Sequence, residues 1–247
     1  MCPVDKGDLM LKAVTFDFWG TIMDANHSLR RRRSEILAGY LGRDVEEVVA
    51  AYGVAWDDFS HGIELGYGLP PQTVLSAALD ALGTALSPPA YGACARRWAE
   101  LLIEEQPDLL DGVPETLRTL RRQGYWIGLI SDTGTTPGRV IRACLRRQGL
   151  LRMFDRLTFS DEMGVTKHRP QAFWSTLRAI GVRPEEALHV GDLPGTDIHG
   201  ARAAGLHTAL ILACSQHREA IPYADIVLDE MGELPAKLAA WRAATER

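Results

Sequence analysis

Apolar residues along this chain follow two different periods. Residues 13–16 form a short, almost continuously apolar run, which predicts a buried β-strand. From residue 28 onward apolar positions recur every three to four residues, which predicts helices at 28–41, 45–61, 70–82 and 88–105. Strands and helices then alternate. The predicted strands are 126–131, 156–160, 187–191, 207–212 and a short one near Ile226; the predicted helices are 113–123, 137–148, 170–180, 198–204 and 234–241.

Repeated strand and helix units indicate an α/β fold, with a Rossmann-like parallel sheet and helices on both faces. The helical stretch interrupts this alternation directly after the first strand. We therefore predict a core built from residues 1–24 and 109–247, and an inserted all-helical cap domain of residues 25–108 that lies over the strand ends.

Composition narrows the class of protein and of partner. The chain has 247 residues, of which 46% are hydrophobic, enough for one large or two modest domains. A formal net charge of −5 argues against nucleic acid as a partner, and no apolar stretch is long enough to cross a membrane. The four cysteines are scattered and predict free thiols. We expect a cytoplasmic protein, monomeric or homodimeric, that acts on a small molecule.

Candidate chemistry begins at the end of the first strand. Asp17 directly follows the apolar run, and the carboxyl ends of parallel strands are where open α/β sheets bind their ligands. Gly20 allows a close backbone approach, and Thr21 offers a hydroxyl group. Asp17 is therefore a candidate nucleophile, a candidate metal ligand, or both.

Three later segments also carry polar residues at the end of a predicted strand or just before a predicted helix. Ser131 and Asp132 end the predicted strand 126–131. Lys167 lies in a loop before a helix, in a chain where only 4 of the 27 basic residues are lysines. Asp192 and Asp197 follow the strand 187–191, and two carboxylates so spaced around a turn suit a hard cation with oxygen ligands.

Together these motifs resemble those of the haloacid dehalogenase-like hydrolase superfamily, in its subgroup with a helical cap. The resemblance implies a phosphatase in which Asp17 attacks phosphorus to form an aspartyl-phosphate. It further implies that Ser131 and Lys167 hold the phosphoryl group of a small phosphorylated metabolite. Thr21 and Asp132 are the other predicted substrate-binding residues. Mg²⁺ is the implied cofactor, with these ligands: Asp17, the carbonyl oxygen of Trp19, Asp192 and Asp197.

The first motif departs from the family's usual pattern at one position. The second aspartate, the general acid and base of the family's phosphatases, is Trp19 here. An indole N–H has no titratable proton near neutral pH, so Trp19 cannot protonate a leaving alkoxide. Three consequences are open. The enzyme is a slow phosphatase, or a cap residue supplies the proton (His27, Asp57, Asp58 or His61), or the site binds a ligand without turnover. Alternatively, Trp19 packs at the strand end.

Two rival functions follow from the same motifs. The superfamily's haloacid dehalogenases also carry an aromatic residue in place of the second acid, but they use no metal, so a metal-free 2-haloacid dehalogenase is one alternative. A catalytically silent relative that binds a ligand or a protein is the other. Between Lys12 and Lys167 there is no lysine, which argues against a Schiff-base mechanism. Most of the arginines at 30–33 should be solvated, and one is a candidate contact for the substrate anion.

Overall fold

A computed structural model of the chain describes residues 10–24, 28–105 and 107–245. The strands are β1 Ala13–Phe16, β2 Trp126–Ser131, β3 Arg156–Phe159, β4 Ala187–Gly191, β5 His207–Ile211 and β6 Ile226–Leu228. The α-helices are α1 Ser28–Leu41, α2 Val45–Glu64, α3 Gln72–Ala81, α4 Pro88–Glu104, α5 Val113–Arg122, α6 Gly138–Arg147, α7 Ser160–Met163, α8 Pro170–Ala179, α9 Gly200–Ala203 and α10 Leu234–Thr245. None of the helices in these ranges is both long and apolar enough to span a membrane.

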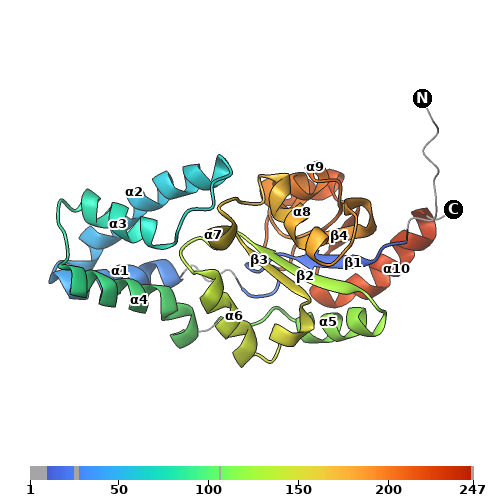
Figure 1. The fold of residues 1–247 in the computed structure, drawn as a ribbon, viewed down its shortest axis with the longest axis horizontal. Coiled ribbons are helices and arrows are strands. Elements are labelled where there is room, and N and C mark those ends of the chain that lie inside the picture. Colours follow the sequence, from blue (N-terminus) through green and yellow to red (C-terminus); the bar gives the residue numbers. More distant parts are fainter. Residues whose placement is uncertain (1–9, 25–27, 106, 246–247) are drawn as a thin grey trace.

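The strands form one parallel sheet with the order β3-β2-β1-β4-β5-β6. Helices α8 and α9 cover one face, and α5, α6 and α10 cover the other (Figure 1). The predicted α/β fold is therefore confirmed. Strand order reverses between β1 and β4, and a crevice at such a switch point is the usual ligand site of doubly wound sheets.

The sequence of β1 explains its central place. All four of its residues are buried, as a strand covered on both faces requires. Val14 and Phe16 point into the larger hydrophobic cluster, which includes residues of α5, α6 and α10, whereas Ala13 packs with Phe173 of α8 on the opposite face. β1 thus lies in the middle of the core, and the residue that follows it is held firmly.

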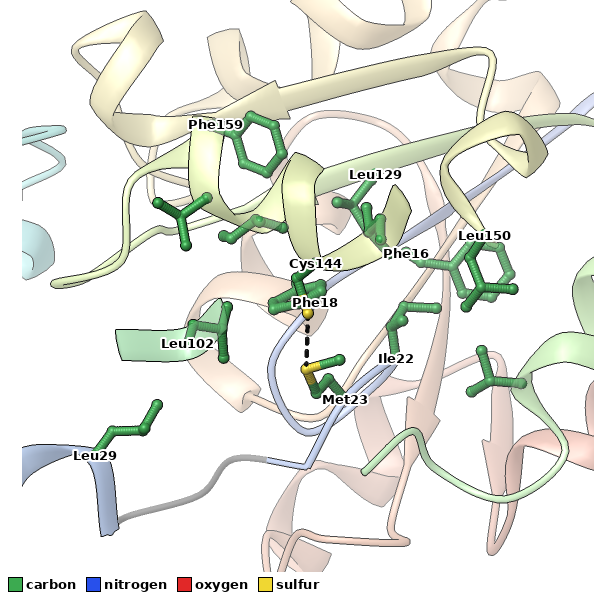
Figure 2. Close-up of a cluster of buried hydrophobic side chains, with 14 of the residues drawn as sticks. Phe16, Phe18, Ile22, Met23, Leu29, Leu102, Leu129, Cys144, Leu150 and Phe159 are labelled. Carbon is green, nitrogen blue, oxygen red and sulfur yellow. Dashed lines mark hydrogen bonds between the residues drawn. The ribbon is translucent and has the colours of Figure 1, made fainter. Parts of the chain in front are cut away.

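Helices α1 to α4 lie beyond one end of the sheet, apart from the helices that cover its faces (Figure 1). Their inner surface is continuous with the larger hydrophobic cluster. Figure 2 shows Leu102 of α4 next to Phe18 in the turn after β1, and Leu29 of α1 belongs to the same cluster as Phe18 and Met23. The position of these helices agrees with a cap, and the division into residues 25–108 and the remainder of the chain stays a prediction.

One predicted helix differs from the structure. We expected a helix at 198–204, whereas a π-helix, Pro194–His199, precedes the short α9. The wider π-helical turn is stabilised by Asp197, whose Oδ2 accepts a hydrogen bond of 3.0 Å from the Leu193 N–H. Such turns occur frequently at functional sites, and this one brings Asp197 back toward the strand end.

Candidate active site

Asp17 lies at the carboxyl end of β1 and is only 4% exposed. Its backbone N–H donates to the carbonyl of Val190 in β4 at 2.9 Å, so the sheet ladder continues one residue past β1 and fixes its position. Gly20 follows in a left-handed turn with φ of 69°. A Cβ at Gly20 would lie 2.6 Å from Asp192 Oδ2, so the turn needs glycine to let the two acidic segments meet.

Lys167 joins these acids from the loop before α8. Its ammonium is 2.5 Å from Asp17 Oδ1 and 2.5 Å from Asp197 Oδ1, and the residue is 2% exposed. Asp132 accepts a hydrogen bond of 3.1 Å from the Lys167 backbone N–H. Burial alone would lower the pKa of the ammonium, but the three aspartates outweigh it and raise that pKa above its usual range. Lys167 is therefore a fixed positive charge in this site.

Both carboxylate oxygens of Asp197 accept hydrogen bonds. Besides Lys167, its Oδ1 contacts Nε2 of His189 at 3.0 Å, and its Oδ2 accepts from Leu193. Burial favours the neutral carboxyl, yet Lys167 and His189 together hold the pKa of Asp197 well below its usual range. Asp197 is therefore a permanent carboxylate that orients Lys167.

The pKa values of Asp17 and Asp192 shift in the opposite direction to that of Asp197. Burial raises the pKa of Asp17 to about 7 and that of Asp192 to about 8, and the nearby carboxylates add to the effect at both. Carboxylate oxygens of Asp17, Asp192 and Asp197 all lie within 4.8 Å of one another. Four buried or partly buried carboxyls, counting Asp132, face a single Lys167. Ionising all four would leave an excess of negative charge, and a divalent cation would offset it.

Several polar atoms around this cluster have no hydrogen-bond partner among the described residues. One is Oδ1 of Asp192, and the others are hydroxyls of Thr21, Ser131 and Thr196. A buried polar atom without a partner is costly, so such atoms at a strand end indicate the place of a ligand or ion. Thr21, Ser131 and Asp192 were expected in the site from the sequence, and the structure leaves them free to contact a ligand.

The sequence analysis missed two of the residues in this cluster. His189 lies inside the apolar strand β4, where it bridges Asp197 and the Thr15 hydroxyl, whose Oγ1 is 2.9 Å from Nδ1. The only sequence signal was a histidine inside an otherwise apolar strand, two residues before the Gly191-Asp192 pair. Thr196 carried no signal, because its burial depends on the π-helix.

Trp19 is half-buried and packs beside the motif. Its ring meets Phe18 edge-on, with 4.9 Å between centroids, and it contacts the larger hydrophobic cluster. This contact favours the packing interpretation of Trp19. Of the proposed proton donors, Asp57, Asp58 and His61 lie exposed on α2, and the described part of the chain shows no hydrogen bond from them to Asp17 or Lys167. His27 lies outside the described residues.

The segment after α2 is clamped onto the loop that carries Lys167. The Gly68 N–H donates to Gly164 at 3.0 Å, and the Thr166 N–H donates to Gly66 at 3.2 Å. Thr166 Oγ1 also donates to the carbonyl of Ile63 at 3.0 Å. The residue directly before Lys167 is thus held by main-chain contacts from the helical segment, which links the position of α2 to that of the lysine.

Gly68→Ala should weaken this clamp. An added Cβ would lie 2.0 Å from the Ser160 carbonyl oxygen, and a backbone atom cannot rotate away. We expect a loss of about 1–3 kcal/mol in the free energy of unfolding. Gly53→Ala is the matched control, because Gly53 is exposed within α2 with nothing near its Cβ position, and it should gain about 0.5–1 kcal/mol. Urea unfolding of both variants measures this, and equal stability would disprove the clamp.

Comparison with known proteins identifies the family of this chain. The family model for haloacid dehalogenase-like hydrolases matches residues 11–205. A glyceraldehyde 3-phosphate phosphatase from Methanopyrus kandleri is 30% identical over 217 residues, which covers 82% of this chain and 84% of that protein. A pyrophosphatase, PpaX, from Bacillus cereus is 32% identical over 136 residues, 54% of this chain and 59% of the relative.

Solved structures share the fold. A phosphatase of the same superfamily from Thermococcus onnurineus has a TM-score of 0.66 and 24% identity, covering 92% of this chain and 97% of that one. A 2-haloacid dehalogenase from Pseudomonas syringae has a TM-score of 0.71 and 24% identity, covering 94% and 100%. The family match over most of the chain confirms the resemblance predicted from the motifs. The chain belongs to the haloacid dehalogenase-like hydrolases.

Proposed function

We propose that this hydrolase is a Mg²⁺-dependent phosphatase that cleaves a small phosphorylated substrate through an aspartyl-phosphate at Asp17. The observation that carries the proposal is the excess of buried carboxylate around one lysine, with Asp192 Oδ1 and the Ser131 hydroxyl left without partners. The names of the relatives, among them phosphatases that act on glyceraldehyde 3-phosphate and on pyrophosphate, support phosphoryl chemistry.

In the proposed reaction, a carboxylate oxygen of Asp17 attacks phosphorus and forms a bond to it. The bond between phosphorus and the ester oxygen breaks, and the leaving oxygen takes up a proton. Water then attacks the aspartyl-phosphate, which restores the carboxylate and releases phosphate. Lys167 offsets charge on the phosphoryl group, while the hydroxyls of Thr21 and Ser131 donate hydrogen bonds to its oxygens.

The donor set fits Mg²⁺, which prefers oxygen ligands and retains several waters. Asp17 and Asp192 would hold it directly, together with the carbonyl oxygen of Trp19, and Asp197 lies in the same cluster. Because both oxygens of Asp197 already accept hydrogen bonds, Asp192 is the freer ligand of the pair. When bound, the ion would neutralise charge on the phosphoryl group.

The two alternative functions remain distinct from this proposal. A metal-free dehalogenase would use Asp17 to attack carbon, and a silent relative would bind without turnover. The acidic cluster favours phosphoryl chemistry, because phosphate esters carry the charge that a bound metal neutralises, whereas a metal-free dehalogenase has no use for three clustered aspartates as metal ligands. We further propose that residues 25–108 form the cap that selects the substrate.

Mg²⁺ should raise the melting temperature of the wild-type chain, and Asp192→Asn should remove most of that rise. Metal binding to the folded state stabilises that state by about 2.7 kcal/mol when the free metal concentration exceeds Kd about 100-fold. Asp80→Asn, on an exposed position of α3, is the control and should keep the rise.

The increase in melting temperature caused by Mg²⁺ should itself become larger as the pH rises. Folding raises the pKa of Asp17 to about 7 and that of Asp192 to about 8, so without metal their protonation stabilises the fold. That stability is fully present below the ordinary aspartate pKa of about 3.9 and is lost as pH rises through about 7 and about 8. Since Mg²⁺ binds the ionised carboxylates, thermal shifts should be larger at about pH 8.5 than at about pH 6. No shift at the higher pH would contradict the proposed metal site.

A further inference from the structure

His189 is a polar residue in the middle of the apolar strand β4. Its neighbours in the strand, Leu188 and Val190, are apolar, and the histidine is fully buried. Both ring nitrogens nevertheless have a partner: Nε2 is 3.0 Å from Asp197 Oδ1, and Nδ1 is 2.9 Å from the Thr15 hydroxyl. An imidazole in the core costs free energy that an apolar residue would not, unless its nitrogens are paired. The two partners therefore decide what this residue does.

These partners assign one tautomer to the ring. Asp197 is an ionised carboxylate and can only accept a hydrogen bond, so Nε2 of His189 carries the proton. Burial lowers the pKa of His189, which favours the neutral ring and leaves Nδ1 as an acceptor for the Thr15 hydroxyl. Thr15 thus turns the ring N–H toward Asp197.

Packing holds the ring in this orientation. Thr15 and His189 lie opposite each other in the paired strands β1 and β4. Phe173 of α8, which covers this face of the sheet (Figure 1), meets the ring edge-on with 5.0 Å between centroids and is itself fully buried. The imidazole cannot turn without breaking both hydrogen bonds, so its N–H is a fixed donor behind the acidic cluster.

This donor shares one oxygen of Asp197 with Lys167. The ammonium of Lys167 lies 2.5 Å from Asp197 Oδ1 and 2.5 Å from Asp17 Oδ1, so it is divided between two carboxylates. Because two donors to one oxygen compete for its negative charge, the bond from His189 weakens the pull of Asp197 on the ammonium. A Cβ at Gly191 would overlap the Asp197 carboxyl, so this group also lies tightly against the end of β4. His189 therefore sets both the place of Asp197 and its hold on the lysine.

We propose that His189, oriented by Thr15, is a positioning residue for the reaction and acts through Asp197. Its N–H keeps the ammonium of Lys167 beside Asp17, where that charge meets the incoming phosphoryl group. This inference rests on the proposed phosphatase function. Without the His189 donor, Asp197 Oδ1 would belong to Lys167 alone and would draw the ammonium away from the phosphoryl group, whose charge it offsets.

Single-turnover release of an aryl alcohol, with enzyme and Mg²⁺ in excess over an aryl phosphate, tests this role. His189→Leu keeps an apolar side chain in β4 but removes the N–H, and the rate should fall about 10- to 100-fold, the value of a hydrogen bond to a charged group. His189→Gln places an amide N–H where Nε2 lies and should recover most of that loss. A residue that only stabilised the strand would change the melting temperature and leave the rate of the folded enzyme unchanged.

The positioning role is rejected if folded His189→Leu keeps its rate within about twofold of wild type, since even a neutral hydrogen bond is worth about that much. It is equally rejected if His189→Gln is as slow as His189→Leu.

Thr15→Val tests the orientation of the ring. Valine matches threonine in shape but leaves Nδ1 of His189 without its donor, so the single-turnover rate should fall about 2- to 10-fold. Thr158→Val is the matched control, because the Thr158 hydroxyl, in the edge strand β3, is equally buried and pairs with Thr176 at 2.7 Å. It should keep the wild-type rate, and equal rates in the two valine variants would contradict the role of Thr15.

If no variant and no wild-type sample hydrolyses an aryl phosphate, the phosphatase proposal fails separately. Inorganic phosphate with Mg²⁺ then decides the role of His189 through melting temperatures. Phosphate should raise them in every folded protein, but the concentration that gives half of the shift should be about 10-fold higher for His189→Leu than for wild type, His189→Gln and Thr158→Val. Any other result rejects the positioning role.

Discussion

The Asp17→Asn variant should lose phosphatase activity by about 10⁴-fold or more, because the amide is a poor nucleophile and cannot form the aspartyl-phosphate. Asparagine has nearly the same shape as aspartate, and the backbone N–H of residue 17 still donates to Val190. The fold should therefore survive the change, while the nucleophile is lost and one ligand of the proposed Mg²⁺ site is weakened. Steady-state hydrolysis of an aryl phosphate with Mg²⁺ measures the loss.

Asp80→Asn makes the same chemical change on an exposed position of α3 and should keep wild-type activity. Melting curves of both variants show that they are folded. If folded Asp17→Asn retains more than about a tenth of the wild-type rate, Asp17 is not the nucleophile, because a lost nucleophile costs far more.

Trp19→Asp should accelerate turnover by up to about 10² to 10⁴-fold, the range that general acid and base catalysis supplies. In the wild type, attack by Asp17 needs no base at position 19, but hydrolysis of the aspartyl-phosphate proceeds without one. The intermediate should accumulate, giving a burst of no more than one product per site followed by a slow phase. Stopped-flow assays with an aryl phosphate should show the slow phase rise in the variant.

Trp19→Asn separates this chemistry from the loss of packing. It removes the same contact with Phe18 but supplies no acid, so it should be destabilised like Trp19→Asp while its slow phase stays at the wild-type rate. If Trp19→Asp is folded, binds Mg²⁺ and is slower than wild type, Trp19 does not stand for a missing acid. Asp57, Asp58 and His61 would then be the next residues to change.

Features set by short segments could be predicted from the sequence. The apolar run before Asp17 and the alternation after residue 113 predicted the strands, because burial on both faces of a parallel sheet leaves a continuous apolar signal. Asp17, Lys167, Asp192 and Asp197 were all proposed for one site, and the structure brings them together. Polar residues at the carboxyl ends of neighbouring strands necessarily meet at the same edge.

Features set by contacts between distant segments could not be predicted. The burial of Arg33 depends on Trp98 and Thr136, which lie 65 and 103 residues away along the chain. Four consecutive arginines carry no periodic signal that separates the buried one from its solvated neighbours. The contact between Gly68 and Gly164 is a main-chain hydrogen bond. Such bonds do not depend on side-chain type, so apart from the glycines the sequence gives no signal for them.

Trapping the phosphorylated enzyme tests the central claim, that Asp17 carries the phosphoryl group, most directly. Wild-type protein would be mixed with an aryl phosphate and Mg²⁺, quenched in acid within the burst, and analysed by peptide mass spectrometry. We predict one phosphoryl group per chain, on Asp17, that is absent from Asp17→Asn and from samples without Mg²⁺. A phosphoryl group on another residue, or turnover with no phosphorylated enzyme during a burst, would contradict the account.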